Sequence, residues 1–482
     1  MPSVSPEPRL KSETCEPKGS APQQSEAVIE GSPPLKKGEQ GGFDATETYI
    51  CGNPPYLGST WQSPSQKADL QAIFNGRTKS WKSLDYVAGW FMKAADYGVS
   101  TRTTAAFVST NSICQGQQVP ILWPLIFDTG AEIAFAYTSF KWANLAAHNA
   151  GVTVVVVGLS QHVGATRRLF TQDESGEEIV QETNNISPYL VPGANFTIAK
   201  TKQPISQVTL MHRGSGPVDG GHLFLNNSER EALLIDYPNA IKFIAPYSNS
   251  EEFINGKSRY CFWIHDEDSD EAITIPPLAG RLFAVKEMRQ ASRKKQTNEL
   301  ADFPHRFGEI RHKDSDTVLV VPRVSSENRA YLPVGLLTGN TIIGDRNFAL
   351  YDAPLWNMAL IASRLHWVWI GTVCVRMRTD FSYSNTLGWN TFPVPTLTTK
   401  NKTDLTRCAE NILLAREAHF PATIADLYNP DNMPDNLRHA HEQNDEVLER
   451  IYIGRRFKND TERLEKLFEL YTKMTSEEAS KS

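Results

Sequence analysis

The residues best suited to chemistry are Asn53, Pro54, Pro55 and Tyr56, which directly follow a run, residues 48–52, typical of a short buried strand. An exocyclic amine on a nucleobase is a poor nucleophile, because its lone pair is delocalised into the ring. A side-chain carbonyl such as that of Asn53 and a backbone carbonyl beside the prolines can accept both amine hydrogens. Together they would aim the nitrogen at a methyl donor.

The aromatic residue of this tetrapeptide adds a second function. The face of Tyr56 can stack on a base that has been extruded from a duplex. The tetrapeptide is therefore predicted to be catalytic. The alternative is a rigid Pro-Pro turn without chemistry, since such turns punctuate many loops.

Positive charge gathers between Arg281 and Arg329, where 11 Lys and Arg stand against 7 Asp and Glu in a chain whose net charge is −6. The densest part contains Arg289, Arg293 and the pair Lys294 and Lys295. Cations at this density neutralise phosphates, and arginine is the commonest reader of guanine edges. The segment is predicted to bind nucleic acid; the alternative is a solvated charged face.

The elements around the tetrapeptide alternate between strands and helices. Apolar spacing predicts a helix over 84–97, with Ser83 as its N-cap and Gly98 just past its end. Strands are predicted over 104–110, 132–137 and 152–159, the last two apolar enough to be central. This alternation is typical of one half of a doubly wound α/β sheet.

The rest of the chain has a different pattern. Mixed α+β sequence extends from about residue 165 to 395, and charged helical patterns follow over 405–418, 437–453 and 461–471. At the other end, Pro, Gly and Ser make up 18 of the first 42 residues, and no Phe, Tyr or Trp occurs among them. We expect residues 1–42 to be disordered.

Composition excludes several classes of protein. With 482 residues, 40% of them apolar, the chain can bury several cores. Its longest apolar runs fall far short of the roughly 20 residues that cross a bilayer. We expect a cytoplasmic protein without membrane contact. No spacing of His or Cys suggests a metal, and none is assigned.

Several longer stretches carry a family resemblance. Together with the tetrapeptide, which looks like motif IV of amino-methylating DNA methyltransferases, they resemble the MmeI-like restriction–modification enzymes from about Phe43 to the C-terminus. The stretches are Cys51–Gly58 (CGNPPYLG), Leu84–Val87 (LDYV), Ala106–Ser112 (AFVSTNS), Gln115–Gln118 (QGQQ) and Phe135–Trp142 (FAYTSFKW).

The resemblance implies a site-specific, adenine-specific DNA methyltransferase that uses S-adenosylmethionine and binds double-stranded DNA. It implies a partial Rossmann-like methyltransferase sheet at 43–165, a target-recognition domain at 166–395 and a helical C-terminal domain at 396–482. An aromatic from the loop after motif VIII, Phe140 first and Trp142 second, would stack on the flipped base. Residues expected in the recognition domain to contact DNA, besides the basic cluster, are Arg306, Arg323, Glu327 and Arg329.

One departure from the family pattern concerns the cofactor. A Gly-rich loop after the first strand and an acidic residue after the second normally hold S-adenosylmethionine. Neither is recognisable before Thr48. We therefore expect the cofactor-binding half to be missing from this chain and supplied by a partner chain. The isolated chain would then not bind S-adenosylmethionine.

Two other interpretations stay open. The chain could be a decayed fragment without activity, or a DNA-binding specificity module that recognises a site and transfers nothing. Methylation of glutamine amides or of RNA bases also uses the Asn-Pro-Pro-Tyr pattern, but the long basic recognition region disfavours it.

Overall fold

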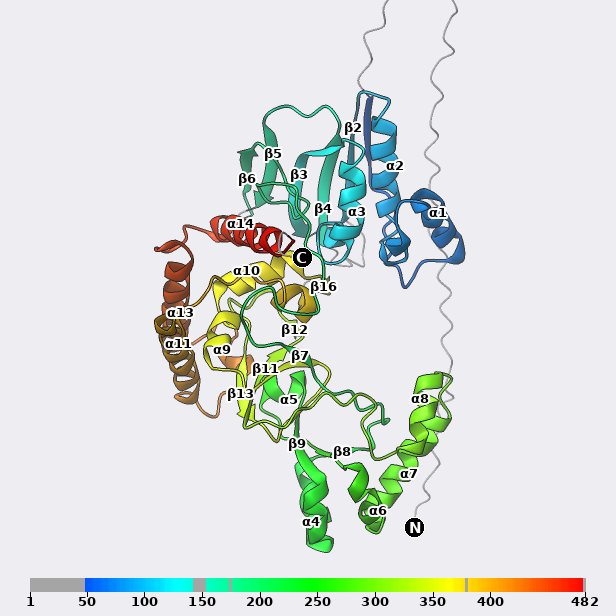
Figure 1. Ribbon diagram of the computed structural model, residues 1–482, viewed down its shortest axis with the longest axis vertical. Helices are drawn as coiled ribbons and strands as arrows, with labels where there is room; N and C mark the ends of the chain where they lie inside the picture. Colours follow the sequence, from blue (N-terminus) through cyan, green and yellow to red (C-terminus); the bar gives the residue numbers. More distant parts are fainter. Residues whose placement is uncertain (1–47, 142–152, 173–175, 378–379, 480–482) are drawn as a thin grey trace, which may run out of the picture. The chain divides into compact units, whose positions relative to one another are not determined.

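The computed structural model describes residues 48–141, 153–172, 176–377 and 380–479 (Figure 1). The disorder expected for residues 1–42 and the stacking residue Trp142 lie outside these ranges. Everything described belongs to one unit that extends from Ala45 to Ser482.

The N-terminal part is built on a six-stranded sheet with the order β1-β2-β4-β3-β5-β6. Pairs β1/β2 and β3/β5 are parallel, whereas β4 runs antiparallel to both of its neighbours. The valine-rich β4 is almost wholly buried, as its apolar sequence predicted. The strands are β1 (Thr48–Gly52), β2 (Thr103–Thr110), β3 (Glu132–Lys141), β4 (Thr153–Ser160), β5 (Arg167–Gln172) and β6 (Glu178–Thr183).

The first strand corrects the expectation of a buried strand. Among the described strands β1 pairs only with β2, so it lies at an edge of the sheet. Its residues are half-buried or exposed, and the ring of Tyr49 is 70% exposed. Apolar sequence alone cannot distinguish an edge strand from a central one, because that difference depends on the neighbouring strands.

Three helices accompany this sheet, α1 (Pro64–Phe74), α2 (Ala88–Gly98) and α3 (Gln118–Phe127). Helix α2 contacts β2 and β4 and lies beside β2 in Figure 1. The rings of Phe91 on α2 and Phe107 on β2 pack in a T-shaped arrangement, with their centroids 5.3 Å apart. The helix predicted from residue 84 begins only at Ala88, and Ser83 does not cap it. The preceding residues are held in a turn by side-chain contacts of Asp85, described below.

Smaller sheets form the middle of the chain, and helices lie between their strands. The sheet orders are β14-β9-β10-β8, β13-β11-β15-β7 and β12-β17-β16. The strands are β7 (His212–Arg213), β8 (Phe224–Leu225), β9 (Ile244–Ser248), β10 (Tyr260–Phe262), β11 (Thr317–Pro322), β12 (Val324–Ser325), β13 (Gly335–Thr338), β14 (Ile342–Ile343), β15 (Asn347–Tyr351), β16 (Arg376–Met377) and β17 (Asp380–Ser382). The helices are α4 (Asn227–Asp236), α5 (Ser250–Asn255), α6 (Ser269–Ala272), α7 (Pro276–Gln290) and α8 (Lys295–Glu299).

The C-terminal part is helical, as the charge and apolar spacing predicted. Helix α11 packs against α9 and α13, and α10 packs against α14 (Figure 1). A reciprocal capping box between Thr398 and Asn401 starts α11 six residues earlier than the apolar pattern indicated. The helices are α9 (Trp356–Ile361), α10 (Arg364–Val373), α11 (Thr399–Glu417), α12 (Ile424–Leu427), α13 (Asp435–Ile453) and α14 (Asp460–Ala479).

No helix in the described ranges is long and apolar enough to cross a membrane.

Candidate active site and nucleic-acid interface

The Asn-Pro-Pro-Tyr turn leaves the sheet at the carboxyl end of β1. Asn53 and Pro55 are exposed, Pro54 is buried, and Tyr56 is half-buried against the main hydrophobic core. The turn is thus anchored by Pro54 and Tyr56 and presents the amide of Asn53 to solvent. That arrangement leaves Asn53 able to accept hydrogen bonds from a ligand.

Two buried polar side chains hold the chain just after the turn. The Asp85 carboxylate accepts the backbone N–H of Leu57 at 2.8 Å and that of Val87 at 3.2 Å. The Gln62 amide donates to the carbonyls of Leu57 and Leu84, at 2.9 and 3.0 Å. Burial raises the pKa of Asp85, against the opposing effect of these backbone donors. Asp85 and Gln62 therefore fix the backbone of Leu57, the residue directly after the Asn53–Tyr56 turn.

Sequence reasoning did not identify Asp85 or Gln62 as part of this site. The Leu84–Val87 stretch contributed to the family resemblance, but its spacing was interpreted as the start of a helix. Asp is a common turn residue because its carboxylate can accept the backbone N–H two residues on, so Asp85 itself was a turn signal within the predicted helix.

Phe140 lies on the strand β3 itself and not in the loop after it, which corrects the expectation. It pairs with Val154 of β4, which in turn pairs with Thr110 of β2. Strands β1, β2 and β3 all run in the same direction, so Asn53 and Phe140 both lie at the end of the sheet where the carboxyl ends of these strands meet. Three strand spacings separate β1 from β3, roughly 14 Å.

A small aromatic pocket of about 130 Å³ lies beside Phe140. Its walls include Tyr137 and Phe170, whose rings stack at 4.3 Å with an interplanar angle of 7°. The pocket offers apolar ring faces at the same sheet edge as the Asn-Pro-Pro-Tyr turn.

Arg289 does not contact solvent, contrary to the expectation that it binds DNA. It is 0% exposed, and its guanidinium donates to five backbone carbonyls. Since a guanidinium has five N–H donors, none is left for a phosphate or a base. Arg289 is a structural residue that joins α7 to the segment 300–306; the acceptors are Pro217, Val218, Leu300, Phe303 and Arg306.

The neighbouring cations do reach the surface. Arg293, Lys294 and Lys295 are all exposed at the junction of α7 and α8. Within the described residues their charged groups make only a 3.7 Å pair between Lys295 and Glu299, itself largely solvated. These three side chains are free to approach a polyanion.

The other predicted recognition residues are half-buried and partly engaged. Arg323 donates to the Asp345 carbonyl at 2.7 Å, and Arg329 donates to the Ser325 hydroxyl at 3.2 Å. Burial lowers the pKa of both guanidinium groups. Glu327 lies between them in the sequence and is also half-buried.

Arg306 lines an open cleft of about 690 Å³ that sequence reasoning missed. The guanidinium of Arg306 forms an ion pair with Asp266. The ring of His305 also lies 2.9 Å from the Asp266 carboxylate. Arg306, with the larger effect, and His305 lower the pKa of Asp266 to about 2. The cleft is also lined by Trp263, His312 and Lys313. Arg306 is therefore already neutralised by an acidic partner.

No described residue is assigned to a cofactor. The exposed amide of Asn53 at a strand's carboxyl end fits the amine side of a methyl-transfer site, where a donor would approach from the same edge. Within the described ranges no strand covers the outer edge of β1, which is where further strands of such a sheet would pair. Likewise, no cluster of metal-binding side chains occurs in the part of the chain that the structure describes.

Comparison with known proteins gives a consistent answer along the chain. Residues 12–171 match the DNA-methyltransferase domain of MmeI, residues 192–396 its target recognition domain, and residues 397–478 its C-terminal domain. DNA methyltransferase A of Bacillus subtilis (strain 168) is 41% identical over 429 residues, which cover 89% of this chain and 48% of that protein.

A solved structure agrees. The type IIL restriction–modification enzyme MmeI in complex with DNA superposes with a TM-score of 0.81 at 34% identity, over 89% of this chain and 57% of MmeI. The chain thus spans about half the length of the relatives it matches. Because three MmeI domain models match consecutive parts of the chain, it belongs to the MmeI-like family of DNA methyltransferases.

Proposed function

We propose that this chain carries the target-amine site and the specificity region of a site-specific DNA methyltransferase within a restriction–modification system. The enzyme transfers a methyl group from S-adenosylmethionine to the exocyclic amine of a flipped adenine in double-stranded DNA. The observation that carries the proposal is the exposed Asn53 amide in an Asn-Pro-Pro-Tyr turn at the carboxyl end of β1.

The residues of the turn divide the work of activating the amine. The Asn53 Oδ1 and the backbone carbonyl of Pro54 accept its two hydrogens, which draws the nitrogen lone pair out of the ring. Tyr56 stacks on the base, and Phe140, with Trp142 beside it in the sequence, supports the base from across the sheet edge. S-adenosylmethionine, when bound, would supply the methyl group and leave as the thioether S-adenosylhomocysteine, while the amine nitrogen gives up one proton to water.

Sequence readout belongs to the recognition region between about residues 166 and 395. Arg293, Lys294 and Lys295 supply phosphate contacts, because they are exposed and almost unpaired in the described structure. Arg306, Arg323, Glu327 and Arg329 lie closer to the protein interior, where partial burial holds them in defined orientations. We infer that Arg323, Glu327 and Arg329 contact base edges, and that Arg306 does so only by exchanging its partner Asp266 for a base.

The position of the strands that bind S-adenosylmethionine is inferred from the sheet. Strands that hold S-adenosylmethionine pair with the outer edge of β1, either from a partner chain or from another part of the same protein. The exposed ring of Tyr49 and the solvent-facing pattern of β1 support this docking edge.

Methylation assays with matched controls test the proposal. The chain, alone and with the remaining half of a relative supplied in trans, is mixed with duplex DNA and labelled S-adenosylmethionine. We expect Asn53→Ala to slow methyl transfer by roughly 100-fold or more, the effect of removing one positioned hydrogen-bonding group. Asn75→Ala, at the exposed end of α1, is the control and should leave the rate unchanged.

Base stacking is followed separately with 2-aminopurine in place of the target adenine. Tyr56→Ala should reduce the fluorescence change on binding, whereas Tyr97→Ala, at an exposed tyrosine, should not. Mass analysis of the product nucleoside identifies N6-methyladenine. Near-normal rates for both Asn53→Ala and Tyr56→Ala in folded protein would refute the assignment. DNA binding without any methyl transfer would favour a specificity module.

A further inference from the structure

The loop of residues 326–334 has two unlike halves. Residues 326–329 are polar and at least partly exposed, and they include Glu327 and Arg329. Residues 331–334 are buried in the main hydrophobic core together with residues of α11 and α13. The buried half therefore determines where the polar half is presented.

Three side chains anchor this loop to the helical part of the chain. The Tyr331 hydroxyl donates to the Asp445 carboxylate at 3.0 Å, and the Arg416 guanidinium donates to the carbonyl of Val334. Arg364 lies 3.4 Å from the carbonyl of Ala330. Two of the three contacts come from α11 and α13, which lie beyond the recognition region in the sequence.

Aromatic packing reinforces the hydrogen bond of Tyr331. Its ring stacks on that of His441 at 4.2 Å with an interplanar angle of 15°. The Nε2 atom of His441 lies 2.7 Å from the hydroxyl of Tyr428. That hydroxyl also accepts a hydrogen bond from Arg416 at 2.9 Å. The ring of Tyr331 is thus joined back to its own loop, first by stacking on His441 and then by hydrogen bonds through Tyr428 and Arg416 to the carbonyl of Val334.

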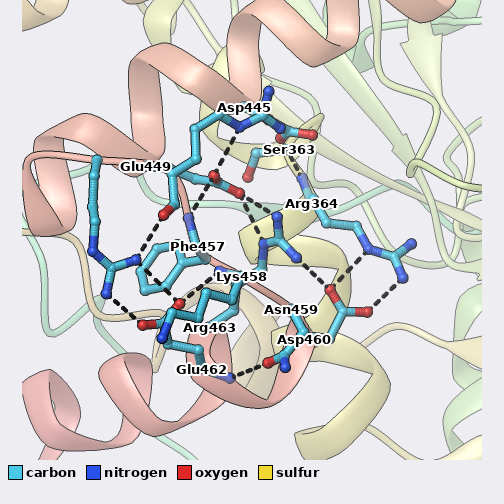
Figure 2. Close-up of polar contacts among 12 residues, drawn as sticks. Ser363, Arg364, Asp445, Glu449, Phe457, Lys458, Asn459, Asp460, Glu462 and Arg463 are labelled. Carbon is cyan, nitrogen blue, oxygen red and sulfur yellow. Dashed lines mark hydrogen bonds and ion pairs between the residues drawn. The ribbon is translucent and has the colours of Figure 1, made fainter.

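Asp445 is itself held inside a larger charged cluster, shown in Figure 2. The Asp445 carboxylate accepts the backbone N–H of Arg364 at 2.7 Å. One turn later on α13 lies Glu449, which is fully buried. Glu449 accepts from Arg463 at 2.8 Å, and Arg463 also donates to Asp460 at 2.8 Å. Asp460 in turn forms an ion pair with the guanidinium of Arg364.

Stability alone does not explain the two buried acidic residues of this cluster, Asp445 and Glu449. Removing two carboxylates from water costs several kcal/mol, and apolar side chains of similar volume often serve stability as well or better. What a fully hydrogen-bonded buried network adds is a unique arrangement of the segments it joins. Here the joined segments are the 326–334 loop, the start of α10 and the helices α13 and α14.

We propose that Tyr331 and Asp445 are positioning residues for DNA sequence discrimination: through them the C-terminal helices hold the 326–334 loop in the conformation that presents Glu327 and Arg329 to the bases. This inference rests on the proposed function. It assigns to the helical domain a role in readout that does not require contact with DNA.

The first test needs no DNA. Hydrogen exchange is measured for the amides of residues 326–334 in the full chain carrying Tyr331→Phe, which keeps the ring and removes the hydroxyl. Loss of one such hydrogen bond should speed exchange there by roughly fivefold. The control is Tyr452→Phe. Tyr452 lies on α13, as Asp445 does, and this substitution removes its buried 2.7 Å hydrogen bond to the carbonyl of Pro393. Equal exchange rates in the two variants would overturn the anchoring role.

The second test measures discrimination. A preferred duplex is selected from a random pool with the wild-type chain, and its affinity is compared with that of a scrambled duplex. For Tyr331→Phe and Asp445→Ala we expect the ratio to fall by roughly fivefold, with the affinity for the scrambled duplex within about twofold of wild type. Tyr452→Phe should leave the ratio unchanged.

The outcomes separate the two proposals. Faster exchange with an unchanged ratio would overturn the positioning role while leaving the DNA-binding function intact. A wild-type chain without any sequence preference would overturn the proposed function and the role in readout, and the exchange experiment would still report whether Tyr331 anchors the loop.

Discussion

The carboxylate of Asp85 accepts the backbone N–H of Leu57, the residue after the Asn-Pro-Pro-Tyr turn, at 2.8 Å. The two residues are 28 positions apart, so the hydrogen bond joins the residue after the Asn-Pro-Pro-Tyr turn to the turn that precedes α2. Through this contact a buried acid fixes the backbone directly after the turn that carries the exposed Asn53.

We predict that Asp85→Ala weakens both the fold and the methyl-transfer site. The substitution leaves the N–H groups of Leu57 and Val87 without their acceptor, which costs about 1–3 kcal/mol. Methyl transfer should fall at least tenfold, because the turn loses its fixed position. Urea unfolding and the labelled-methyl assay measure the two effects.

Asp85→Asn is the matched control, since it retains one oxygen as an acceptor. It should recover most of the stability and part of the rate. A rate for Asp85→Ala equal to wild type would show that the turn needs no support from Asp85.

Reversing the basic cluster is predicted to change the salt dependence of DNA binding. Arg293, Lys294 and Lys295 are exposed, so replacing all three with Glu removes up to three phosphate contacts without disturbing the core. Each contact contributes about 0.9 to the slope of log affinity against log salt. The slope should become shallower by up to roughly 3 in fluorescence anisotropy titrations. An unchanged slope would identify the cluster as a solvated face.

Arg289 is predicted to behave in the opposite way. Arg289→Lys offers three donors in place of five, so carbonyls of the segment 300–306 lose their partners inside the protein. We expect a loss of roughly 2 kcal/mol or more in unfolding free energy. Under conditions in which the variant is folded, its salt slope should equal that of wild type. A shallower slope with full stability would return Arg289 to the DNA interface.

The contrast between Arg289 and Arg293 shows how far the sequence could predict the site. Both lie in the same basic run, and composition treats them alike. The structure separates them because α7 turns Arg289 toward carbonyls of two distant segments, whereas Arg293 follows the end of that helix. Burial of a cation depends on long-range packing, which residue type and local charge do not record.

Local features were predicted better. The sequence correctly predicts the strand before Asn53, the strands β2 to β4 and the three charged C-terminal helices. Each of these elements has a local apolar pattern of its own. The antiparallel insertion of β4 between β2 and β3 was not predicted, because strand order and direction depend on residues far apart in the chain. The start of α2 was misplaced for a similar reason: Gln62 and Leu57, distant in sequence, hold residues 84–87 in a turn.

The charged cluster around Asp445 predicts a pH dependence of stability. Burial, first, and the charge of Glu449 raise the pKa of Asp445 to about 7, against the opposing effects of the Arg364 backbone, the Tyr331 hydroxyl and Arg463. In the unfolded chain the same carboxyl titrates near its ordinary value of 3.8. Between these two values the folded protein keeps a proton that the unfolded chain releases.

The contribution of this group is therefore fully present below about pH 4 and is lost as the pH rises toward 7. Asp445→Asn cannot titrate, so the difference in unfolding free energy between wild type and this variant isolates the effect. We expect wild type to lose stability relative to Asp445→Asn from about pH 4.5 to 7 and the difference to level off above. Urea unfolding at several pH values across that range and one above it measures this difference. Parallel stability curves for the two proteins would mean that Asp445 keeps an ordinary pKa in the folded state.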